Sequence, residues 1–377
     1  MTVAGIIFSN LHDQSVPELT RFRTMGSVPF GCRYRLIDFS LSNMVNSGIT
    51  NIGIITHYNY QSLMDHLGTG KDWDLARRSG GIKILPPYIT AFAQNGSPSL
   101  YSHRLEAIIG IQSFIHDLNE EYVVCSDCDA ICNIDLEDVI KTHAKTGADL
   151  TIVTKNMYVL ANENRDITIT RASKDDKLEA MFPSSAVSNG FYDVSLNIMV
   201  FTKRYLESLI ADSIARSYIS FRTELIPKKL GQDNIMVYNY DGYYNSINSV
   251  RDYYMCNMDL LNADARNSLF AVSNRPILTK VRNSKPTYYS PDAQVKDSLI
   301  ADGCQIEGVV ENSILFRGVK VSKGTVVKNC ILMQDTYCGA NTTLNCVITD
   351  KNVVIRDGRN LSGYETRPFF IEKDAMV

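Results

Sequence analysis

Residues 9–15, Ser-Asn-Leu-His-Asp-Gln-Ser, follow an apolar, strand-like segment at residues 2–8. A strand that runs into a loop is where nucleotide-binding proteins commonly bind phosphate. Backbone N–H groups can surround a triphosphate only where side chains leave room, so such loops use glycine and add a lysine or arginine. Residues 9–15 contain neither glycine nor Lys or Arg. The segment has the position of a phosphate loop but lacks the residue types that bind phosphate.

The cysteines offer a second, weaker candidate for chemistry. Cys125, Cys128 and Cys132 have a spacing that could suit a metal, but no second cysteine or histidine pair completes the four ligands of a zinc site. The nine cysteines are scattered and odd in number, and several lie in apolar segments. This pattern favours reduced, buried thiols over a disulfide framework, and we expect no bound metal.

Length and composition restrict the class of protein. A chain of 377 residues with 45% hydrophobic and 21% charged residues predicts a globular protein of two domains. Its formal net charge of -3 gives no basic field for nucleic acid or an anionic membrane, so neither is an expected partner. The N-terminus lacks a basic leader, and no segment approaches ~18 continuous apolar residues. We therefore expect a cytoplasmic protein.

The elements that must position the loop lie in the first ~270 residues, where strand-like and helical segments alternate. Such alternation predicts a largely parallel sheet with helices on both faces and ligands at the carboxyl ends of the strands. Residues 9–15 lie at such an end. The expected strands are residues 2–8, 51–56, 122–126 and 149–154, and the expected helices are residues 39–47, 61–67, 136–145 and 251–267.

The texture changes in the C-terminal part of the chain. From about Tyr289 onward, apolar residues return every five or six positions, with glycine or asparagine between them. This pattern is typical of a left-handed hexapeptide β-helix; a β-sandwich is the alternative. A hexapeptide acyltransferase would need a histidine base, but the last histidine is His143, so we expect a structural, regulatory or oligomerising role. The predicted domains are residues 1–272 and 285–377, with a linker at 273–284.

One long motif resembles a known family. The segment Arg23-Thr-Met-Gly-Ser-Val-Pro-Phe-Gly-Cys-Arg-Tyr-Arg-Leu-Ile-Asp-Phe39 is similar to the N-terminal signature of bacterial ADP-glucose pyrophosphorylases, the glucose-1-phosphate adenylyltransferases. Leu225-Ile-Pro-Lys228 and Asn257-Met-Asp-Leu-Leu261 extend the resemblance. It implies an α/β nucleotidyltransferase domain, Rossmann-like and GT-A-like, with a mixed sheet, followed by a left-handed parallel β-helix.

The departures from the family motifs concentrate at one pocket. The resemblance places the family's phosphate-binding arginine at Ser15 and its lysine at Met25. The nucleotide motif Tyr-x-Gly-Thr-Ala-Asp-Ala becomes Tyr101-Ser-His-Arg-Leu-Glu-Ala107, and of two metal carboxylates only Asp129 remains. The expected vestigial pocket, in which no residue is expected to be catalytic, consists of Asn10, Leu11, Asp13, Ser15, Met25, Glu106, Asp129, Asn197 and Ser246. Asp129 taken alone could equally cap a turn.

Four arginines near this motif form a possible site for an anionic effector: Arg21, Arg23, Arg33 and Arg35. In the family, sugar-phosphate effectors bind basic residues near this loop and near the β-helix. The alternative for these arginines is a solvated or salt-bridged surface.

This selective loss resembles the noncatalytic, GlgD-type subunit of the family. The resemblance implies a regulatory subunit that assembles with a catalytic homologue in a heterotetramer and raises or tunes ADP-glucose synthesis from ATP and glucose 1-phosphate in glycogen biosynthesis. It implies no tightly bound cofactor, with Mg²⁺ required only by the catalytic partner. Two alternatives stay open: a weakly active nucleotidyltransferase, and a stand-alone sensor of a sugar phosphate or nucleotide.

Overall fold

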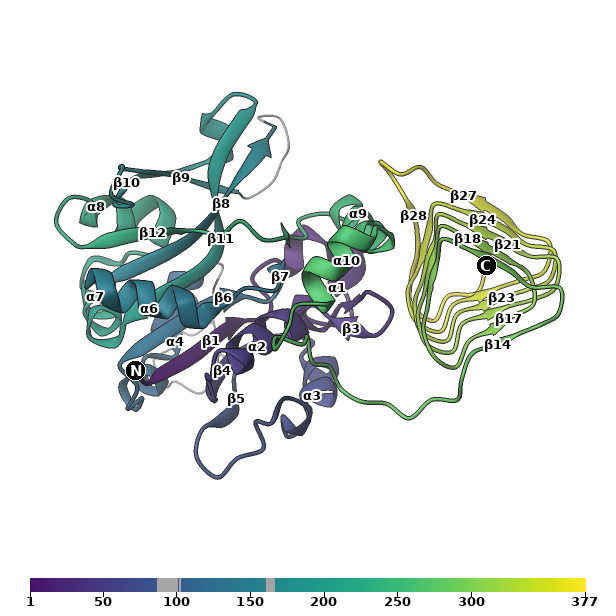
Figure 1. Cartoon of the computed structure of the whole chain (residues 1–377), viewed down its shortest axis with the longest axis horizontal. Helices are drawn as coiled ribbons and strands as arrows, with labels where there is room; N and C mark the ends of the chain where they lie inside the picture. The colour runs from purple at the N-terminus through teal and green to yellow at the C-terminus, as the bar shows by residue number, and fades with distance from the viewer. Residues whose placement is uncertain (87–100, 102, 161–166) are drawn as a thin grey trace.

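The computed structural model of the chain describes residues 1–86, 101, 103–160 and 167–377 (Figure 1). An α/β part ends with α10 (Ala263–Phe270), and a β-helical part begins with β14 (Tyr288–Tyr289). Figure 1 shows the two parts next to each other, with α9 (Val250–Met258) on the side of the α/β part that faces the β-helix.

A nine-stranded mixed sheet forms the centre of the α/β part. Its strands are β1 (Val3–Phe8), β4 (Asn51–Ile55), β5 (Gly81–Leu85), β6 (Tyr122–Asp127), β8 (Leu150–Val159), β9 (Thr168–Ala172), β10 (Leu178–Pro183), β11 (Gly190–Thr202) and β12 (Ile235–Asn239). The order is β10-β9-β11-β6-β1-β4-β5, and β8 pairs with both β11 and β12. β1 runs parallel to β4 and β6, whereas β11 is antiparallel to β6.

Helices cover both faces of this sheet because alternate residues of a strand point to opposite sides. Ile7 of β1 enters the hydrophobic core that contains the apolar residues of α2 and α6, whereas Ile6 and Phe8 enter the core that contains those of α4 and α7. The helices are α1 (Pro17–Thr20), α2 (Ile37–Asn46), α3 (Gln61–Leu67), α4 (Arg104–Gly110), α5 (Gln112–His116), α6 (Leu136–Thr146), α7 (Lys203–Arg216), α8 (Ile226–Lys229), α9 and α10.

Local sequence signals set several helix ends. The Asp135 carboxylate accepts the N–H group of Glu137 at 3.0 Å and caps α6, which ends at Gly147 with a left-handed φ of 60°. The hydroxyl of Ser249 accepts the N–H group of Asp252 at 3.0 Å and caps α9. Two short antiparallel pairs complete this part: β2 (Pro29–Phe30) forms a hairpin with β3 (Tyr34–Arg35), and β7 (Ile131–Cys132) pairs with β13 (Tyr244–Asn245), which is distant in the sequence.

The β-helix consists of coils that each contribute one strand to three parallel, five-stranded sheets. Equivalent residues Ile314, Ile331 and Ile348 pair across successive coils and are buried, so one coil spans 17 residues here. Asn312 and Asn329 adopt left-handed φ at matching corners, and their side-chain amides hydrogen bond at 2.7 Å. The strands are β14, β15 (Gln294–Lys296), β16 (Leu299–Ile300), β17 (Gln305–Ile306), β18 (Val309–Glu311), β19 (Ile314–Leu315), β20 (Lys320–Val321), β21 (Val326–Lys328), β22 (Ile331–Leu332), β23 (Tyr337–Cys338), β24 (Thr343–Asn345), β25 (Val347–Thr349), β26 (Val354–Ile355), β27 (Asn360–Ser362) and β28 (Phe369–Ile371).

Buried contacts join the two parts. Arg23 forms an ion pair of 2.8 Å with Asp350 of the β-helix, and both side chains are almost fully buried. The hydroxyl of Tyr254 on α9 donates to the carbonyl oxygen of Asn329 at 2.8 Å. One hydrophobic core contains residues of both parts, including Leu260 and Phe316. The β-helix is therefore packed on the α/β part along a continuous core.

The predicted fold class is confirmed: a nucleotidyltransferase-type mixed sheet precedes a β-helix. The strand expected at 149–154 extends to Val159 because it pairs along most of the 13-residue strand β11. The helix expected at 251–267 is divided into α9 and α10, because Asn262 caps a new helix by accepting the N–H group of Asp264 at 2.9 Å. Among the helices that the structure describes, none has the length and apolar character needed to cross a membrane.

Candidate functional site

The candidate site lies at the carboxyl ends of β1 and β6. These strands are parallel neighbours whose register pairs Phe8 with Asp127, so the segments that leave them start side by side. Residues 9–15 follow β1, Asp127 ends β6 and Asp129 follows it. Arg104, the first residue of α4, reaches the same place. The location predicted for the site is therefore the location at which its charged side chains meet.

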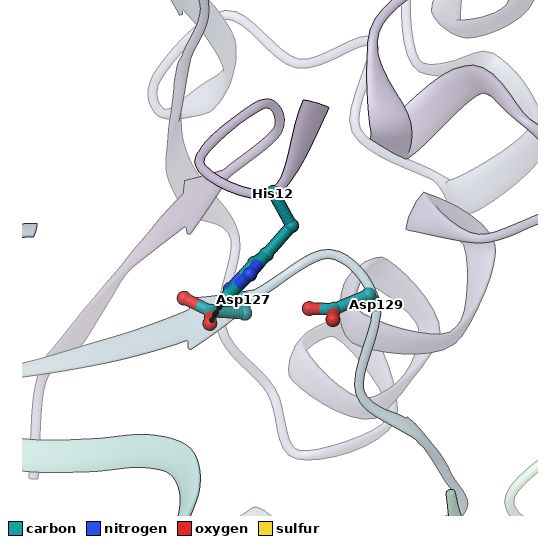
Figure 2. Close-up of side chains that lie close together, drawn as sticks. All are labelled: His12, Asp127 and Asp129. Atoms are coloured by element: carbon teal, nitrogen blue, oxygen red, sulfur yellow. Dashed lines mark hydrogen bonds and ion pairs between the residues drawn. The ribbon is translucent and has the colours of Figure 1, made fainter. Parts of the chain in front are cut away.

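Four charged or titratable side chains meet at this edge. Nε2 of His12 lies 3.1 Å from Oδ2 of Asp127. Nε of Arg104 donates to Oδ1 of Asp127 at 2.8 Å, and Nη2 of Arg104 donates to Oδ2. Figure 2 shows His12 extending from its loop to Asp127, with the Asp129 carboxylate beside the same ring. His12, Asp127 and Asp129 are buried, and each offers a ligand atom within 4.8 Å of the others.

The cluster balances its charges internally. Burial disfavours a charged His12, but the Asp129 and Asp127 carboxylates outweigh burial and raise the pKa of His12 to about 9. Burial opposes ionisation of Asp127 as well, yet the Arg104 guanidinium holds the pKa of Asp127 below its usual range. Burial raises the pKa of Asp129, which His12 opposes. With its proton on Nε2, His12 donates to Asp127, so an imidazolium and a guanidinium face two carboxylates.

Backbone hydrogen bonds fix the conformation of the loop after β1. The N–H groups of Ser9, Asp13 and Ser15 donate to the carbonyl oxygens of Ile55, Asn10 and His12 at 3.1, 3.4 and 3.0 Å. These groups cannot at the same time donate to a phosphate. The loop is also tied to the residues that follow it, because Gly26 N–H donates to the Ser9 carbonyl oxygen at 2.8 Å.

Side chains occupy the space that glycines would leave open. Oδ1 of Asp13 accepts the Met25 N–H group at 2.7 Å, and burial raises the pKa of Asp13 to about 7 against the effect of that bond. Oδ1 of Asn10 accepts the Tyr101 hydroxyl at 3.0 Å. Leu11 packs into the hydrophobic core with α4 and α7. The loop is thus a closed structural turn.

The structure brings together only some of the residues predicted for the vestigial pocket. Leu11, Ser15 and Asn197 line one pocket together with His12 and Arg104. Met25 is fully buried in the core, and Ser246 accepts a hydrogen bond from Asn248 at 3.2 Å and does not line that pocket. The Glu106 carboxylate accepts the His103 N–H group at 3.1 Å and caps α4. Asn197 has a left-handed φ of 55° where the β11 pairing shifts register.

The donor set does not fit the magnesium ion that the family resemblance implies. Mg²⁺ favours an octahedral shell of oxygen ligands, commonly one or two carboxylates with phosphates and waters. Both oxygens of Asp127 already accept hydrogen bonds from Arg104, and His12 would contribute a nitrogen. Asp129 is the one remaining carboxylate of the cluster, and it faces two cationic side chains.

A second pocket is strongly basic and lies where the α/β part, the linker and the β-helix meet. Six cationic residues line it: Arg33, Arg35, Lys280, Arg282, Arg317 and Lys351. Arg35 donates to the carbonyl oxygen and hydroxyl of Ser62 at 2.7 and 2.8 Å. Burial together with Arg35 and Arg23 lowers the pKa of Lys351 to about 7. Arg317 pairs with Asp302 at 2.9 Å, and the positive charge of the other residues favours binding of an anion.

The four arginines predicted for an anion site lie in different environments. Arg33 and Arg35 line the basic pocket through β3 and the turn before it. Arg23 donates to Asp350 and is buried, so its charge is already neutralised. Arg21 pairs with Glu372 at 2.8 Å, and both side chains are 59% exposed. The linker and β-helix residues of the pocket were not among the predicted ones.

Sequence reasoning missed His12, Arg104 and Asp127 as a group. By the motif resemblance, Arg104 takes the place of a threonine in the family's nucleotide motif, and this is the one signal in the sequence. The pairing of β1 with β6 brings His12 next to Asp127, and the hydrogen bonds of Arg104 complete the group.

The fold and site define a sugar-phosphate nucleotidyltransferase scaffold whose phosphate loop is closed. Family models agree with this class: residues 16–165 match "Nucleotidyl transferase", and residues 286–367 match "GlmU-like, C-terminal hexapeptide". The chain belongs to the glucose-1-phosphate adenylyltransferase family. It is 35% identical to "Glycogen biosynthesis protein GlgD" of Bacillus subtilis over 98% of this chain and 95% of that protein.

Relatives named for the enzymatic activity are similar over most of their length. A glucose-1-phosphate adenylyltransferase of Halalkalibacterium halodurans is 35% identical over 86% of this chain and 84% of the relative. Another, from Clostridium perfringens (strain 13), is 32% identical over 89% of this chain and 84% of the relative. The chain is thus related both to a glycogen biosynthesis protein and to nucleotidyltransferases.

Proposed function

We propose that this chain is a regulatory, catalytically impaired subunit that assembles with a catalytic glucose-1-phosphate adenylyltransferase. In this role it raises or tunes ADP-glucose synthesis from ATP and glucose 1-phosphate in glycogen biosynthesis. It needs no tightly bound cofactor of its own, and Mg²⁺ acts in the catalytic partner.

The main support for this proposal is the closed loop after β1. Nucleotidyl transfer depends on positioning the phosphates and stabilising their charge, and each well-placed donor contributes roughly 10²-fold in rate. Here the N–H groups of Asp13 and Ser15 donate within the loop, and the family's loop cations correspond to Ser15 and Met25. Losses of this kind are not additive, but together they leave little of the transition-state stabilisation.

The basic pocket supports a regulatory role. It combines residues of the α/β part, such as Arg33 and Arg35, with Arg317 and Lys351 of the β-helix. An anion bound there would contact both parts of the chain, so its binding energy would depend on their relative arrangement. A sugar phosphate is the expected type of effector because its phosphate group matches arginine geometry.

The test is ADP-glucose formation from ATP, Mg²⁺ and glucose 1-phosphate by three samples. These are this chain alone, a catalytic homologue alone and the two mixed at equal concentration. We expect no turnover by this chain alone and a higher rate, or a changed response to sugar phosphates, in the mixture. Robust turnover by this chain alone would contradict the proposal and favour an active nucleotidyltransferase.

A stand-alone sensor is the second candidate function, and the basic pocket favours it as well, because a single chain supplies all six cationic side chains. Failure to co-purify with a catalytic homologue, together with a thermal shift on adding a sugar phosphate, would select the sensor. The variant Arg33→Ala/Arg282→Ala should lose that thermal shift, whereas Arg171→Ala, at an exposed position far from the pocket residues in the sequence, should retain it.

A further inference from the structure

The cluster at the end of β1 and β6 has the composition of a divalent-metal site. His12, Asp127 and Asp129 each offer a ligand atom, all within 4.8 Å of one another. Imidazole and carboxylate ligands suit Mn²⁺, Co²⁺ and Zn²⁺. Asp129 is 4% exposed, its carboxylate faces His12 (Figure 2), and within the described part of the chain no side chain donates a hydrogen bond to it. Such a buried carboxylate requires a cation nearby.

His12 is the cation next to Asp129, and Arg104 adds a second, permanent cation to the cluster through Asp127. Its guanidinium donates to both oxygens of Asp127, and Nη2 also lies 3.2 Å from Nε2 of His12. A metal ion bound by Asp127 would need the oxygen lone pairs that Arg104 already occupies, and one bound by His12 would first have to displace the proton on Nε2. In either position the ion would stand beside a fixed positive charge. Because arginine stays protonated in proteins, the guanidinium is a permanent occupant.

The guanidinium also links elements that a bound metal could otherwise join. Arg104 begins α4, Asp127 ends β6, and His12 belongs to the loop after β1. Asp127 accepts from both His12 and Arg104, so this carboxylate holds the loop and α4 against the end of β6. A bidentate pair fixes direction as well as charge, which a single ammonium group would not.

We propose that the Arg104 guanidinium is the resident cation of the His12, Asp127 and Asp129 cluster, and that it excludes Mn²⁺ and similar transition-metal ions from a site that otherwise offers three ligand atoms. This inference does not depend on assembly with a catalytic subunit. On this view Arg104 replaces a bound metal ion, and its presence is not simply a sign of lost catalytic function.

The test uses Mn²⁺ as the probe and the EPR signal of free Mn²⁺ as the readout, with the full chain. The proteins are wild type, Arg104→Ala, Arg104→Ala/Asp129→Asn and the exposed control Arg171→Ala. We expect Arg104→Ala to bind about one Mn²⁺ per chain, at least about tenfold more tightly than wild type. Wild type and Arg171→Ala should leave the Mn²⁺ free, and the added Asp129→Asn change should abolish the gained binding.

Stability provides a second readout. Arg104→Ala leaves Asp127 without its partner, so its melting temperature should fall by roughly 5 °C and recover partly on adding Mn²⁺. Arg104→Lys keeps the charge and should still exclude Mn²⁺, which separates charge from shape. Wild type that binds Mn²⁺ as tightly as Arg104→Ala, with loss of binding in Asp129→Asn, would overturn the proposal. A folded Arg104→Ala that binds no Mn²⁺ would overturn it as well.

If Arg104→Ala does not fold, the measurements on wild type and Arg104→Lys still test the proposal. Mn²⁺ binding by wild type that is lost on adding Asp129→Asn would show that the guanidinium does not exclude the metal. The same result with Arg104→Lys would show that a positive charge at this position is not enough to exclude it. ADP-glucose turnover is assayed separately, so failure of this inference leaves the proposed regulatory function to its own test.

Discussion

Removal of the Asp350 carboxylate is expected to destabilise the chain more than removal of its partner Arg23. The two side chains form an ion pair of 2.8 Å and are 3% and 2% exposed, so removing either one leaves the other charge buried without its partner. The free-energy cost then depends on the charges of the neighbouring side chains. Positive charges on Arg23 and Arg35 lower the pKa of Lys351 and Asp350 raises it, so Asp350 is the anion among several cations.

The magnitude follows from this asymmetry. Breaking a buried ion pair costs about 3–5 kcal/mol when the remaining charge is uncompensated. Asp350→Asn leaves Arg23 near Lys351 and Arg35 and should cost about 4 kcal/mol. Arg23→Met leaves Asp350 near Lys351 and with the Lys351 N–H group at 2.7 Å, so about 2 kcal/mol is expected.

Urea unfolding followed by fluorescence and far-UV circular dichroism measures these free energies. The control is Arg21→Met, which breaks the exposed pair with Glu372 and should change the free energy of unfolding by about 0.5 kcal/mol. Sulfate should stabilise Asp350→Asn more than wild type, because an added anion replaces the lost charge. If Arg23→Met costs as much as Asp350→Asn, or both behave like Arg21→Met, the assumed electrostatic asymmetry is refuted.

Four further predictions concern Lys351, Gly308 and His143. The pKa of Lys351 is lowered to about 7 by burial and by neighbouring arginines, so sulfate should bind the basic pocket more tightly at pH 6 than at pH 8 by calorimetry, and Lys351→Met should flatten this difference. Because the pKa of Lys351 is lower in the folded chain, this lysine binds more protons in the unfolded chain between about pH 7 and 10.5. Its contribution to the free energy of unfolding should therefore rise across that pH range and vanish in Lys351→Met. Gly308→Ala would place a Cβ against the Thr325 carbonyl oxygen of the next coil and should lower the free energy of unfolding by about 1–3 kcal/mol. The control Gly48→Ala has open space around its Cβ but a left-handed φ, and should lower the free energy of unfolding by about 1 kcal/mol. Burial lowers the pKa of His143 to about 4, so its contribution to stability should be lost as the pH falls from about 6.5 to 4, and His143→Gln should weaken that pH dependence in thermal unfolding.

The fold could be predicted from the sequence because its signals are local and repeated. Alternating strands and helices indicated the sheet, and recurring apolar residues with Asn or Gly at corners indicated the β-helix. The corner residues Asn312 and Asn329 indeed adopt left-handed φ. The lengths of β8 and β11 were less accessible, because they depend on how far the two strands pair with each other.

The sequence predicted the place of the candidate site and some of its lining, such as Leu11, Ser15, Arg33 and Arg35, but not the contacts among its charged side chains. Missing glycines and cations in residues 9–15 follow directly from the sequence. The contact of His12 with Arg104 joins residues 92 positions apart, and the pair of Arg23 with Asp350 joins residues 327 positions apart. Such contacts depend on the register of β1 with β6 and on the packing of the β-helix, which no single motif reports.

One continuous segment connects the closed site with the domain junction. It begins in the loop after β1, where Asp13 accepts the Met25 N–H group, and it includes Arg23, which is paired with Asp350 of the β-helix. If this chain is catalytically impaired, as proposed, an anion in the basic pocket has no active site in the same chain to influence. Allosteric control requires a second site that responds. Under the proposed function that site belongs to the catalytic partner, so an effector bound to this chain should change ADP-glucose turnover only in the mixed assembly.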